Sequence, residues 1–525
     1  MLATISVAAG NETYDSRDNC NAIIETAQNR LITGCKNTVI PEGITSLGSD
    51  AFSGCRGMST LYIPASLIQG LGTDSGYGLH DITKDMTSIV VASGNPVYDS
   101  RNNCNAIIET ATNKLLMGCP TTVIPNGVTT IGEEAFYRCV GLTSIDIPSS
   151  VTSIEKSAFR CSGLTSVFVP SSVKSLGKSV FEECLNLSSV TLSEGIETLG
   201  YGLFIGTAIT SLTIPSSVHQ IGDSNGSSKY LCETCPKLSS IVVANGNSVY
   251  DSRNNCNAII ETATNTLITG CKSTVIPEGV TAIASYAFYG CMTMKELNIP
   301  KSVRDIKSSA FRNCFGLEKI TVTRGNNFYD SRSDCNALIQ TSSKELILGC
   351  RNTVIPQSIS KIGSYAFYMC PITSITIPAN VTDISSSAFC GCSKLKSVIS
   401  LIEEPFEISN TTFYTYIGLN KLYDENGIKM TLEEYTNIDD DILYGEKIYM
   451  YEDITLYVPG GTKTKYEATS CWNEFKEIIE IDPSGIKDIR TEGAKSTSVY
   501  NISGQKLTAP RKGINIIDGR KVVVK

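Results

Sequence analysis

The sequence is short of the side chains on which most active sites are built. Its 525 residues include two histidines, one tryptophan and only 18% charged residues. The histidines, His80 and His219, lie far apart in the chain, and the Asp and Glu residues are scattered. Neither a catalytic triad nor a metal-binding motif can be assembled from them. We therefore expect no enzyme, no catalytic residue, no bound metal and no cofactor.

Two kinds of partner are disfavoured as well. Lys and Arg number 44 against 52 Asp and Glu, which gives a net charge of −8. Nucleic acids and anionic membranes attract clusters of basic side chains, which this chain lacks. Hydrophobic runs are short, and none approaches the ~20 residues that span a bilayer. We expect a protein that neither binds nucleic acid nor spans a membrane.

What the chain has in abundance is a repeat. Ile-Pro or Val-Pro pairs recur 22 or 23 residues apart, following a pattern related to L-x-x-L-x-L, as in Leu142-x-x-Ile145-x-Ile147. The prolines are Pro41 and Pro64; Pro125, Pro148 and Pro170; Pro277 and Pro300; and Pro356 and Pro378. A period of about 20 to 29 residues is typical of leucine-rich repeats. The sequence thus predicts a leucine-rich-repeat solenoid, in which each unit is one coil.

Each coil is expected to begin with a strand that alternates inward and outward side chains, with Ile145 and Ile147 inward. The proline ends this strand because it has no N–H to donate. A second short strand follows within 151–154, and an Ala-Phe-x-x-Cys tract, such as 135–139, closes the coil as a short helical turn. Because one coil cannot bury its apolar stripe alone, the coils should stack into one long parallel sheet on one face.

A longer variant of the unit occurs four times and contains two apolar runs around a short polar turn, which predicts a β-hairpin. With the turn at 111–112, the register places Ile108 opposite Leu115 and Ala106 opposite Met117. Each copy carries the motif Tyr-Asp-Ser-Arg, at residues 14–17, 98–101, 250–253 and 329–332.

The same register places two cysteines, 15 residues apart, opposite each other in every hairpin. Opposed cysteines on antiparallel strands are near enough to bridge, and each disulfide would stabilise the fold by roughly 3 kcal/mol. A buried thiol is an equally good interpretation, because the second cysteine also occupies a core position of the repeat. The candidate pairs are Cys20 and Cys35, Cys104 and Cys119, Cys256 and Cys271, and Cys335 and Cys350. The other twelve cysteines recur mostly in the Ala-Phe-x-x-Cys tracts, and we expect them to be reduced.

Three further features admit a chemical interpretation, but packing is the favoured one for each. The Asp and Asn residues of the variant unit lack calcium-loop spacing and are expected to close turns. Cys232 and Cys235 form a lone CxxC, in which Cys232 takes the Phe position and Cys235 the Cys position of the repeat. Two coils, near Gly76 and Asn225, are irregularly long. They lack the context of a phosphate-binding loop, and they offer a second binding edge.

Three segments are distinguished along the chain. Residues 1–400 form the solenoid, which begins within a repeat, because residues 2–17 align with 86–101. The apolar start is therefore interpreted as repeat and not as a signal peptide. Residues 401–482 contain irregular last coils, an acidic Tyr-rich insertion and a C-terminal cap with a short helix bearing Trp472 and Phe475. Residues 483–525 alternate apolar and polar side chains around Gly turns and predict a small β tail of about four strands.

The combination I-P-x-S-V-x-x-I-x-x-x-A-F-x-x-C-x-x-L, present over residues 2–480, resembles the BspA-like leucine-rich-repeat family of bacterial surface proteins. The tail, VYNISGQKL through VVVK, is similar to the C-terminal sorting domains of secreted proteins of the type IX kind. One coil departs from the pattern, with Ser193 in place of proline. The resemblance implies an extracellular or cell-surface protein that adheres to host matrix proteins, other cells or glycans.

The candidate binding surface is the outward row of the sheet face. Its residues are Tyr62, Asp146, Phe168, Thr191, Thr213, Asn298, Thr321 and Thr376. They are mostly small and polar, which indicates a broad surface and no deep pocket. The alternative function is a structural spacer or surface-layer scaffold, since roughly fifteen to eighteen coils at about 4.8 Å per strand would extend some 70–85 Å.

Overall fold

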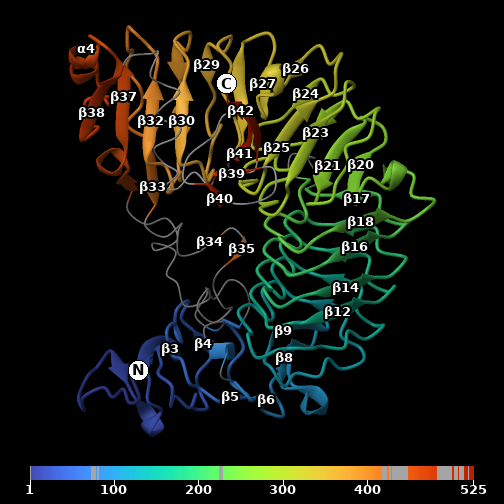
Figure 1. Ribbon diagram of the computed structural model, residues 1–525. Coiled ribbons are helices and arrows are strands. Elements are labelled where there is room, and N and C mark those ends of the chain that lie inside the picture. The colour runs from blue at the N-terminus through green and yellow to red at the C-terminus, as the bar shows by residue number, and fades with distance from the viewer. Residues whose placement is uncertain are drawn as a thin grey trace.

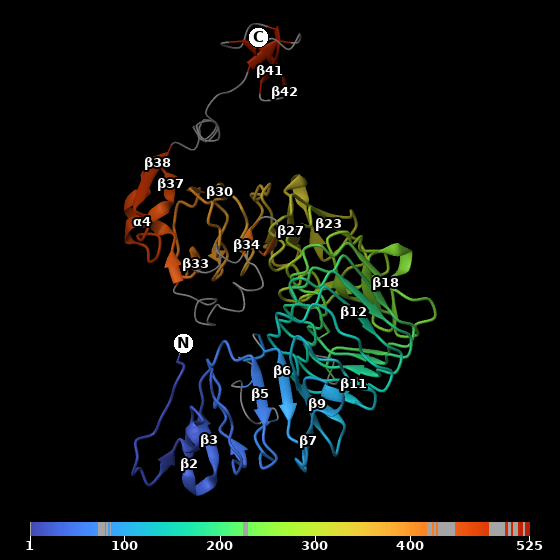
Figure 2. The same ribbon diagram turned by 90° about the horizontal axis from the view of Figure 1, so that it is seen from below.

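The computed structural model describes residues 2–71, 79, 82–84, 86–223, 229–416 and 447–481, together with the backbone of short strands within 423–428 and 499–524. The coils stack into a solenoid that curves as an open arch (Figures 1 and 2). This is the leucine-rich-repeat architecture expected from the 22- to 23-residue period. Several predictions, on His80, on the stretches at Gly76 and Asn225, and on most of the acidic insertion, fall outside the described residues.

Most of the assigned main strands carry four residues, and over most of the solenoid each pairs with only one neighbour. The parallel pairs are β5 (Thr60–Ile63) with β6 (Ser88–Val91), β12 (Ser166–Val169) with β14 (Ser189–Leu192), β16 (Ser211–Ile214) with β18 (Ser240–Val243), and β23 (Glu296–Ile299) with β25 (Lys319–Val322). Towards the C-terminal end, β30 (Ser374–Ile377), β32 (Ser397–Ser400), β37 (Thr455–Pro459) and β38 (Glu477–Ile481) form one four-stranded sheet. Parallel strands line this face as predicted, but they form several short sheets and not one long sheet. Strands of four residues that end at a turn or a proline make few hydrogen bonds, so the ladder is easily interrupted.

The longer ladders run through the short second strands. The largest has the order β17-β15-β13-β11-β10-β9-β8-β7, where the strands are β7 (Tyr98–Asp99), β8 (Ala106–Glu109), β9 (Lys114–Gly118), β10 (Thr130–Ile131), β11 (Ser153–Ile154), β13 (Ser175–Leu176), β15 (Thr198–Leu199) and β17 (Gln220–Ile221). It begins with the antiparallel hairpin β8–β9 of a variant unit and continues as a parallel ladder.

Three other ladders repeat this plan. One contains β1 (Tyr14–Asp15), β2 (Ile23–Glu25), β3 (Arg30–Thr33) and β4 (Ser46–Leu47). Another contains β19 (Tyr250–Asp251), β20 (Ala258–Glu261), β21 (Thr266–Gly270), β22 (Ala282–Ile283) and β24 (Asp305–Ile306). The last contains β26 (Tyr329–Asp330), β27 (Ala337–Gln340), β28 (Glu345–Gly349), β29 (Lys361–Ile362) and β31 (Asp383–Ile384). Each ladder starts at a variant hairpin, so the four variants divide the solenoid into four blocks, numbered 1 to 4 from the N-terminus.

The hairpin register is partly as predicted. Ile108 lies opposite Leu115, but a β-bulge between Ile107 and Ile108 places Ala106 opposite Gly118 and not opposite Met117. Bulges at the same place in β20 and β27 show that the shift belongs to the motif. The glycine is required there because a Cβ on Gly118 would lie 2.1 Å from the ring of Phe136 in the next coil.

The Ala-Phe-x-x-Cys tracts are not the helical turns that the sequence analysis predicted. In the tract at 135–139, turn hydrogen bonds alternate with bonds to the next coil: Tyr137 N–H donates to Glu134 O, and Phe136 N–H donates to Ala158 O. Alternation is achieved because Glu134 and Arg138 have φ of 58° and 56°, in the left-handed region. Every second N–H therefore points along the solenoid axis, where it bonds the neighbouring coil.

The phenylalanines of these tracts stack inside the solenoid. Ring centroids are 5.0 Å apart between Phe136 and Phe159, 5.7 Å between Phe159 and Phe181, and 5.8 Å between Phe181 and Phe204. Similar stacks join Phe288 with Phe311, and Phe367 with Phe389 and Phe413. These rings form the centre of the core and hold successive coils together.

The C-terminal end of the solenoid is covered by a short helix, α4 (Lys463–Ala468), and the turn that follows it (Figure 1). Trp472 and Phe475 are buried in this turn, not in the helix as predicted. Nearby, β33 (Tyr414–Tyr416) pairs with β36 (Lys447–Tyr449), and β34 (Tyr423–Asp424) with β35 (Gly427–Ile428). In the tail, β39 (Val499–Asn501), β40 (Lys506–Leu507), β41 (Gly513–Ile517) and β42 (Arg520–Val524) form one antiparallel sheet, as the alternating pattern indicates.

Candidate functional site

The predicted outward row lies on one face of the main strands, with two qualifications. Tyr62, Phe168, Thr191, Thr213 and Asn298 are exposed, each at an outward position of its strand. Asp146 is exposed but lies outside any assigned strand, while Thr321 and Thr376 are half-buried. Phe168, with 59% of its surface exposed, is paired across the ladder with Thr191.

The same face also carries an apolar row that was not predicted from the sequence. Val90 lies directly opposite Tyr62 in the β5–β6 pair, and both are exposed. Val123 is 72% exposed, and the hydroxyl of its neighbour Thr121 donates to Thr87 O, which places this segment beside β6. Val39, one coil before Tyr62, is exposed too. The outward positions of four successive coils thus present Val39, Tyr62, Val90 and Val123, here called the apolar row; Val39 and Val123 lie outside assigned strands.

The signal for this row was present in the repeat. Val123 precedes Ile-Pro as Asp146 and Phe168 precede Ile-Pro and Val-Pro, so the register alone assigns it an outward position. The same position in later blocks holds exposed Val242, Val275 and Val354. These valines were overlooked because the apolar Thr-Val-Ile-Pro segments resemble core strands when the register is not applied.

The Tyr-Asp-Ser-Arg motif is used to join blocks. The hydroxyl of Tyr250 accepts from Ile221 N–H at 2.9 Å, and that of Tyr329 accepts from Ile306 N–H at 3.0 Å. Both donors belong to the last strand of the preceding block, so each tyrosine ends one ladder where the next begins. Tyr14, with no described coil before it, is 40% exposed.

The other motif residues hold the hairpin itself. Arg101 Nε donates to Asp99 Oδ1 at 2.8 Å, and its Nη1 donates to Asn113 Oδ1 at 2.9 Å in the hairpin turn. Ser100 Oγ accepts from Val91 N–H. In the first copy, the hydrogen bond from Arg17 lowers the pKa of Asp15. Within the described residues, no group of three or more His, Cys, Asp or Glu side chains is arranged to hold a metal ion.

All twenty cysteines are free thiols in this structure, including the eight in the hairpins. The predicted opposition of Cys104 and Cys119 fails because the bulge shifts the register by one residue. The Cys104 Sγ lies 3.8 Å from Ala106 O, whereas the Cys119 Sγ lies 3.5 Å from Asn105 O. The cysteines of each pair are buried and unbridged in this structure, which favours the buried thiol; the choice between the two interpretations stays a prediction.

The cysteines of the turn tracts have a common hydrogen bond. The thiols of Cys184, Cys235 and Cys314 each donate to the carbonyl of the phenylalanine in the preceding coil, with Sγ–O distances of 3.0 Å. Burial raises the pKa of Cys184 to about 12, so it remains a thiol at neutral pH. Cys232 takes the Phe position as predicted, because the preceding Leu231 accepts from Phe204 N–H in the turn ladder. Packing therefore accounts for the CxxC.

Between these two cysteines lies Glu233, whose carboxyl group is buried in an apolar environment. It is 7% exposed, and burial raises its pKa to about 9, with the nearby Cys235 and Glu182 acting in the same direction. The folded state therefore keeps this proton up to about pH 9, whereas the unfolded chain loses it near pH 4.5. Stability must fall as pH rises through this interval.

We expect the Glu233→Gln variant to be more stable than the parent at pH 8 by about 2–3 kcal/mol, and equally stable at pH 4. At pH 8 the folded parent must keep the buried carboxyl protonated, which costs free energy, whereas the amide is neutral at both pH values. Thermal melts at both pH values measure this. The exposed Glu452→Gln provides the matched control and should change neither melt. An equal gain at both pH values would contradict a raised pKa at Glu233.

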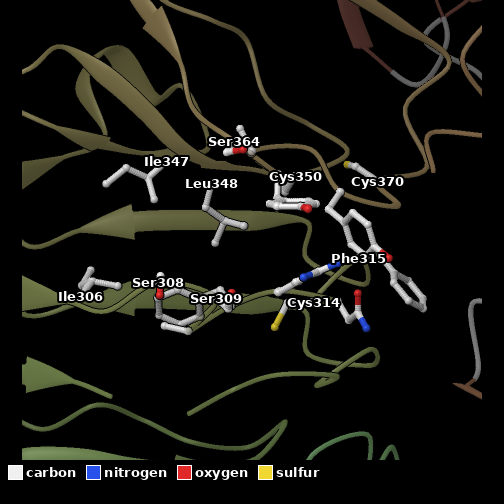
Figure 3. Close-up of a pocket in the computed structure, with 18 of the residues that line it drawn as sticks. Ile306, Ser308, Ser309, Cys314, Phe315, Ile347, Leu348, Cys350, Ser364 and Cys370 are labelled. Atoms are coloured by element: carbon white, nitrogen blue, oxygen red, sulfur yellow. The ribbon is translucent and has the colours of Figure 1, made fainter. Parts of the chain in front are cut away.

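Described residues of the two irregular coils bond across the joints before blocks 2 and 3. In the first, the Thr83 hydroxyl donates to Tyr137 O at 3.3 Å. In the second, Thr234 N–H donates to Tyr289 O at 3.2 Å, so the turn ladder continues past the hairpin. The coil before block 4 has ordinary length, and a cavity of about 340 Å³ remains beside it, lined by residues that include Ile306, Leu348 and Tyr365 (Figure 3).

The stacked coils, short parallel ladders and inward aliphatic positions define a leucine-rich-repeat protein. More narrowly, the chain belongs to the BspA type Leucine rich repeat region family, which matches residues 23–79, 117–233, 267–342 and 339–436 in six copies. The described residues contain no helix long and apolar enough to cross a membrane.

Several solved structures are similar. A leucine rich cell surface protein from Faecalibacterium prausnitzii is 23% identical, with a TM-score of 0.43, over 75% of this chain and 95% of that one. The pneumococcal vaccine antigen PcpA is 18% identical, with a TM-score of 0.40, over 91% and 100%. A leucine-rich repeat protein from Bacteroides ovatus is 20% identical, with a TM-score of 0.33, over 75% and 94%. No curated protein matches the chain at a significant level.

Proposed function

We propose that this chain is an extracellular or cell-surface adhesion protein that binds a ligand on host or neighbouring cells through the outward face of its main strands. The observation that carries the proposal is the apolar row, in which Val39, Tyr62, Val90 and Val123 are exposed on adjacent coils. Water-exposed apolar side chains that lie together are typical of protein interaction surfaces. Exposed Phe168 lies on the same face two coils further on, beyond the exposed Asp146.

Family membership supports the same function. Leucine-rich-repeat scaffolds bind other proteins on extended faces, because stacked coils produce a long row of equivalent positions. One related structure is described as a cell surface protein. The ligand classes that suit this proposal are a host matrix protein, a surface protein of another cell, and a glycan. A flat apolar face favours a protein over a glycan, since sugar binding relies on polar groups in a concave site.

The test is binding of the full chain to an array of matrix proteins and glycans. The double variant Tyr62→Ser with Val123→Ser should lower affinity for the bound ligand by tenfold or more, because it removes two of the four apolar side chains of the row. Phe168→Ala tests the edge of the same face. Thr213→Ser, an equally exposed outward residue, is the control and should bind as the parent does.

The competing function is a structural spacer or surface scaffold without a ligand of its own. Absence of binding across the array by the folded parent protein would favour the spacer. The arch visible in Figures 1 and 2 disfavours the function of a straight spacer, because curvature shortens the distance between the two ends of the solenoid.

A further inference from the structure

The cavity between blocks 3 and 4 lies at the joint whose preceding coil has ordinary length. At the preceding joint, Ile221 of the last short strand and Ile268 of the hairpin are buried. Their counterparts around the cavity, Ile306 and Ile347, are only half-buried, and so is Leu348, whose counterpart Thr269 is buried. Figure 3 shows Ile347 and Leu348 on one wall, with Ile306, Ser308 and Ser309 on the other. Apolar side chains at this joint therefore border the cavity without being fully covered by other residues.

Two cations line the same cavity: Lys307 is paired with Asp305 (Nζ–Oδ2 2.6 Å), whereas Arg312 has no carboxylate partner among the described residues. Arg312 follows Phe311 in its tract, at the position that Arg160 occupies after Phe159. Arg160 is neutralised by Glu183 at 3.0 Å and Glu182 at 3.5 Å. Arg312 forms no ion pair with any described residue. Its guanidinium carbon instead lies over the rings of Tyr365 and Tyr368, at 4.3 and 4.7 Å from their centroids.

The neighbouring polar atoms are also incompletely satisfied. Arg312 Nε is buried without an acceptor, and Asn313 Oδ1 is buried without a donor. Asn313 is 6% exposed and belongs to the cavity lining. Leaving such a group unpaired costs about 1–3 kcal/mol, which a bound partner would recover. A guanidinium held by aromatic rings keeps its planar N–H edge for bidentate binding of a carboxylate.

We propose that this cavity binds a small carboxylic acid that carries a branched or aromatic apolar body, such as the C-terminal residue of a peptide. The carboxylate pairs with Arg312, and the apolar body covers Ile306, Ile347 and Leu348. An amide N–H next to the carboxylate supplies the donor that Asn313 lacks. At about 340 Å³, the cavity has the size of a small-ligand site. The inference concerns a pocket away from the apolar row and does not rest on adhesion.

Titration calorimetry on the full chain tests the site with three probes. N-acetyl-leucine has the carboxylate, the apolar body and the N–H; 4-methylpentanoic acid lacks the N–H; and N-acetyl-leucine amide lacks the carboxylate. We expect N-acetyl-leucine to bind and the amide to bind at least tenfold more weakly. If N-acetyl-leucine binds more tightly than 4-methylpentanoic acid, the ligand of the cavity is the C-terminal end of a peptide. If both bind equally, the ligand is an aliphatic carboxylic acid. Either result supports the site.

Two variants separate the site from general effects on folding. Arg312→Gln should weaken N-acetyl-leucine binding at least tenfold, and Leu348→Trp, which keeps the charge and fills the space, should abolish it. Arg304→Gln, on the exposed side of the same coil, is the matched control. The proposal is overturned if no probe binds, if the amide binds as tightly as the acid, or if Arg312→Gln and Leu348→Trp, both folded by circular dichroism, bind as the parent does.

Discussion

Replacing Phe181 with alanine is expected to lower the free energy of unfolding by about 3–5 kcal/mol, the usual loss for a phenylalanine removed from a core. Phe181 has no exposed surface, and its ring lies between those of Phe159 and Phe204. The space cannot close, because backbone hydrogen bonds fix the coils on both sides: Phe159 N–H donates to Val180 O, and Phe181 N–H donates to Leu203 O. The substitution leaves a cavity at two interfaces between coils.

Urea denaturation followed by circular dichroism measures this loss. The stability of a repeat protein is the sum of its units and their interfaces, so a defect in the middle of block 2 should also separate the unfolding of the coils on either side. Phe168→Ala is the matched control, since it removes the same side chain from the exposed face of the same coil and should change stability by no more than about 0.5 kcal/mol. Equal effects of the two substitutions would show that the rings do not hold the coils together.

The repeat made much of this fold predictable. A period of 22 or 23 residues fixes which positions face inward, so the core positions of Phe136, Cys139 and Ile147 follow from the sequence alone. The same periodicity predicted that Cys232 takes a Phe position, although its coil is irregular. Periodicity works here because each coil contacts mainly its neighbours and repeats their environment.

Predictions failed where the structure depends on a residue outside the period. The bulge at Ile107 has no signature in the hydrophobic pattern, yet it moves Cys119 out of register with Cys104. The helical turn predicted for the Ala-Phe tract was wrong because left-handed φ at Glu134 and Arg138 is set by hydrogen bonds to the next coil, not by local propensity.

Prediction of the candidate sites from the repeat pattern was limited in the same way. An outward row could be read from the register, but the polar interpretation overlooked Val90 and Val123. The cavity before block 4 is recognised only when the joints before blocks 3 and 4 are compared. The sequence shows that the coil before block 4 is shorter than the coil before block 3, but not that Thr234 fills one joint while Arg312 only partly fills the other. Such differences lie in contacts between segments about 50 residues apart, which a periodic pattern does not encode.

The Trp472→Ala variant is expected to lose about 3–5 kcal/mol of stability and to become prone to association. Trp472 is fully buried, and its Nε1 donates to Phe406 O at 2.8 Å. Its ring lies 5.3 Å from that of Tyr466, whose hydroxyl donates to Ile402 O at 2.8 Å. These contacts tie the turn after α4 to the last coils and cover their apolar interior. Without the indole, the end of the solenoid is open to water.

Thermal melts with static light scattering would measure both effects. Trp472→Phe keeps an aromatic ring but loses the hydrogen bond, so it should lose only about 1–2 kcal/mol and stay monodisperse. Tyr449→Ala, which removes an exposed aromatic nearby, is the control for a change outside the cap. If Trp472→Ala melts and scatters as the parent does, the turn does not act as a cap. A solenoid without a cap exposes the same apolar surface that its own coils use to stack. If Trp472→Ala associates while Trp472→Phe does not, an aromatic ring at this position prevents the end of the solenoid from pairing with another copy.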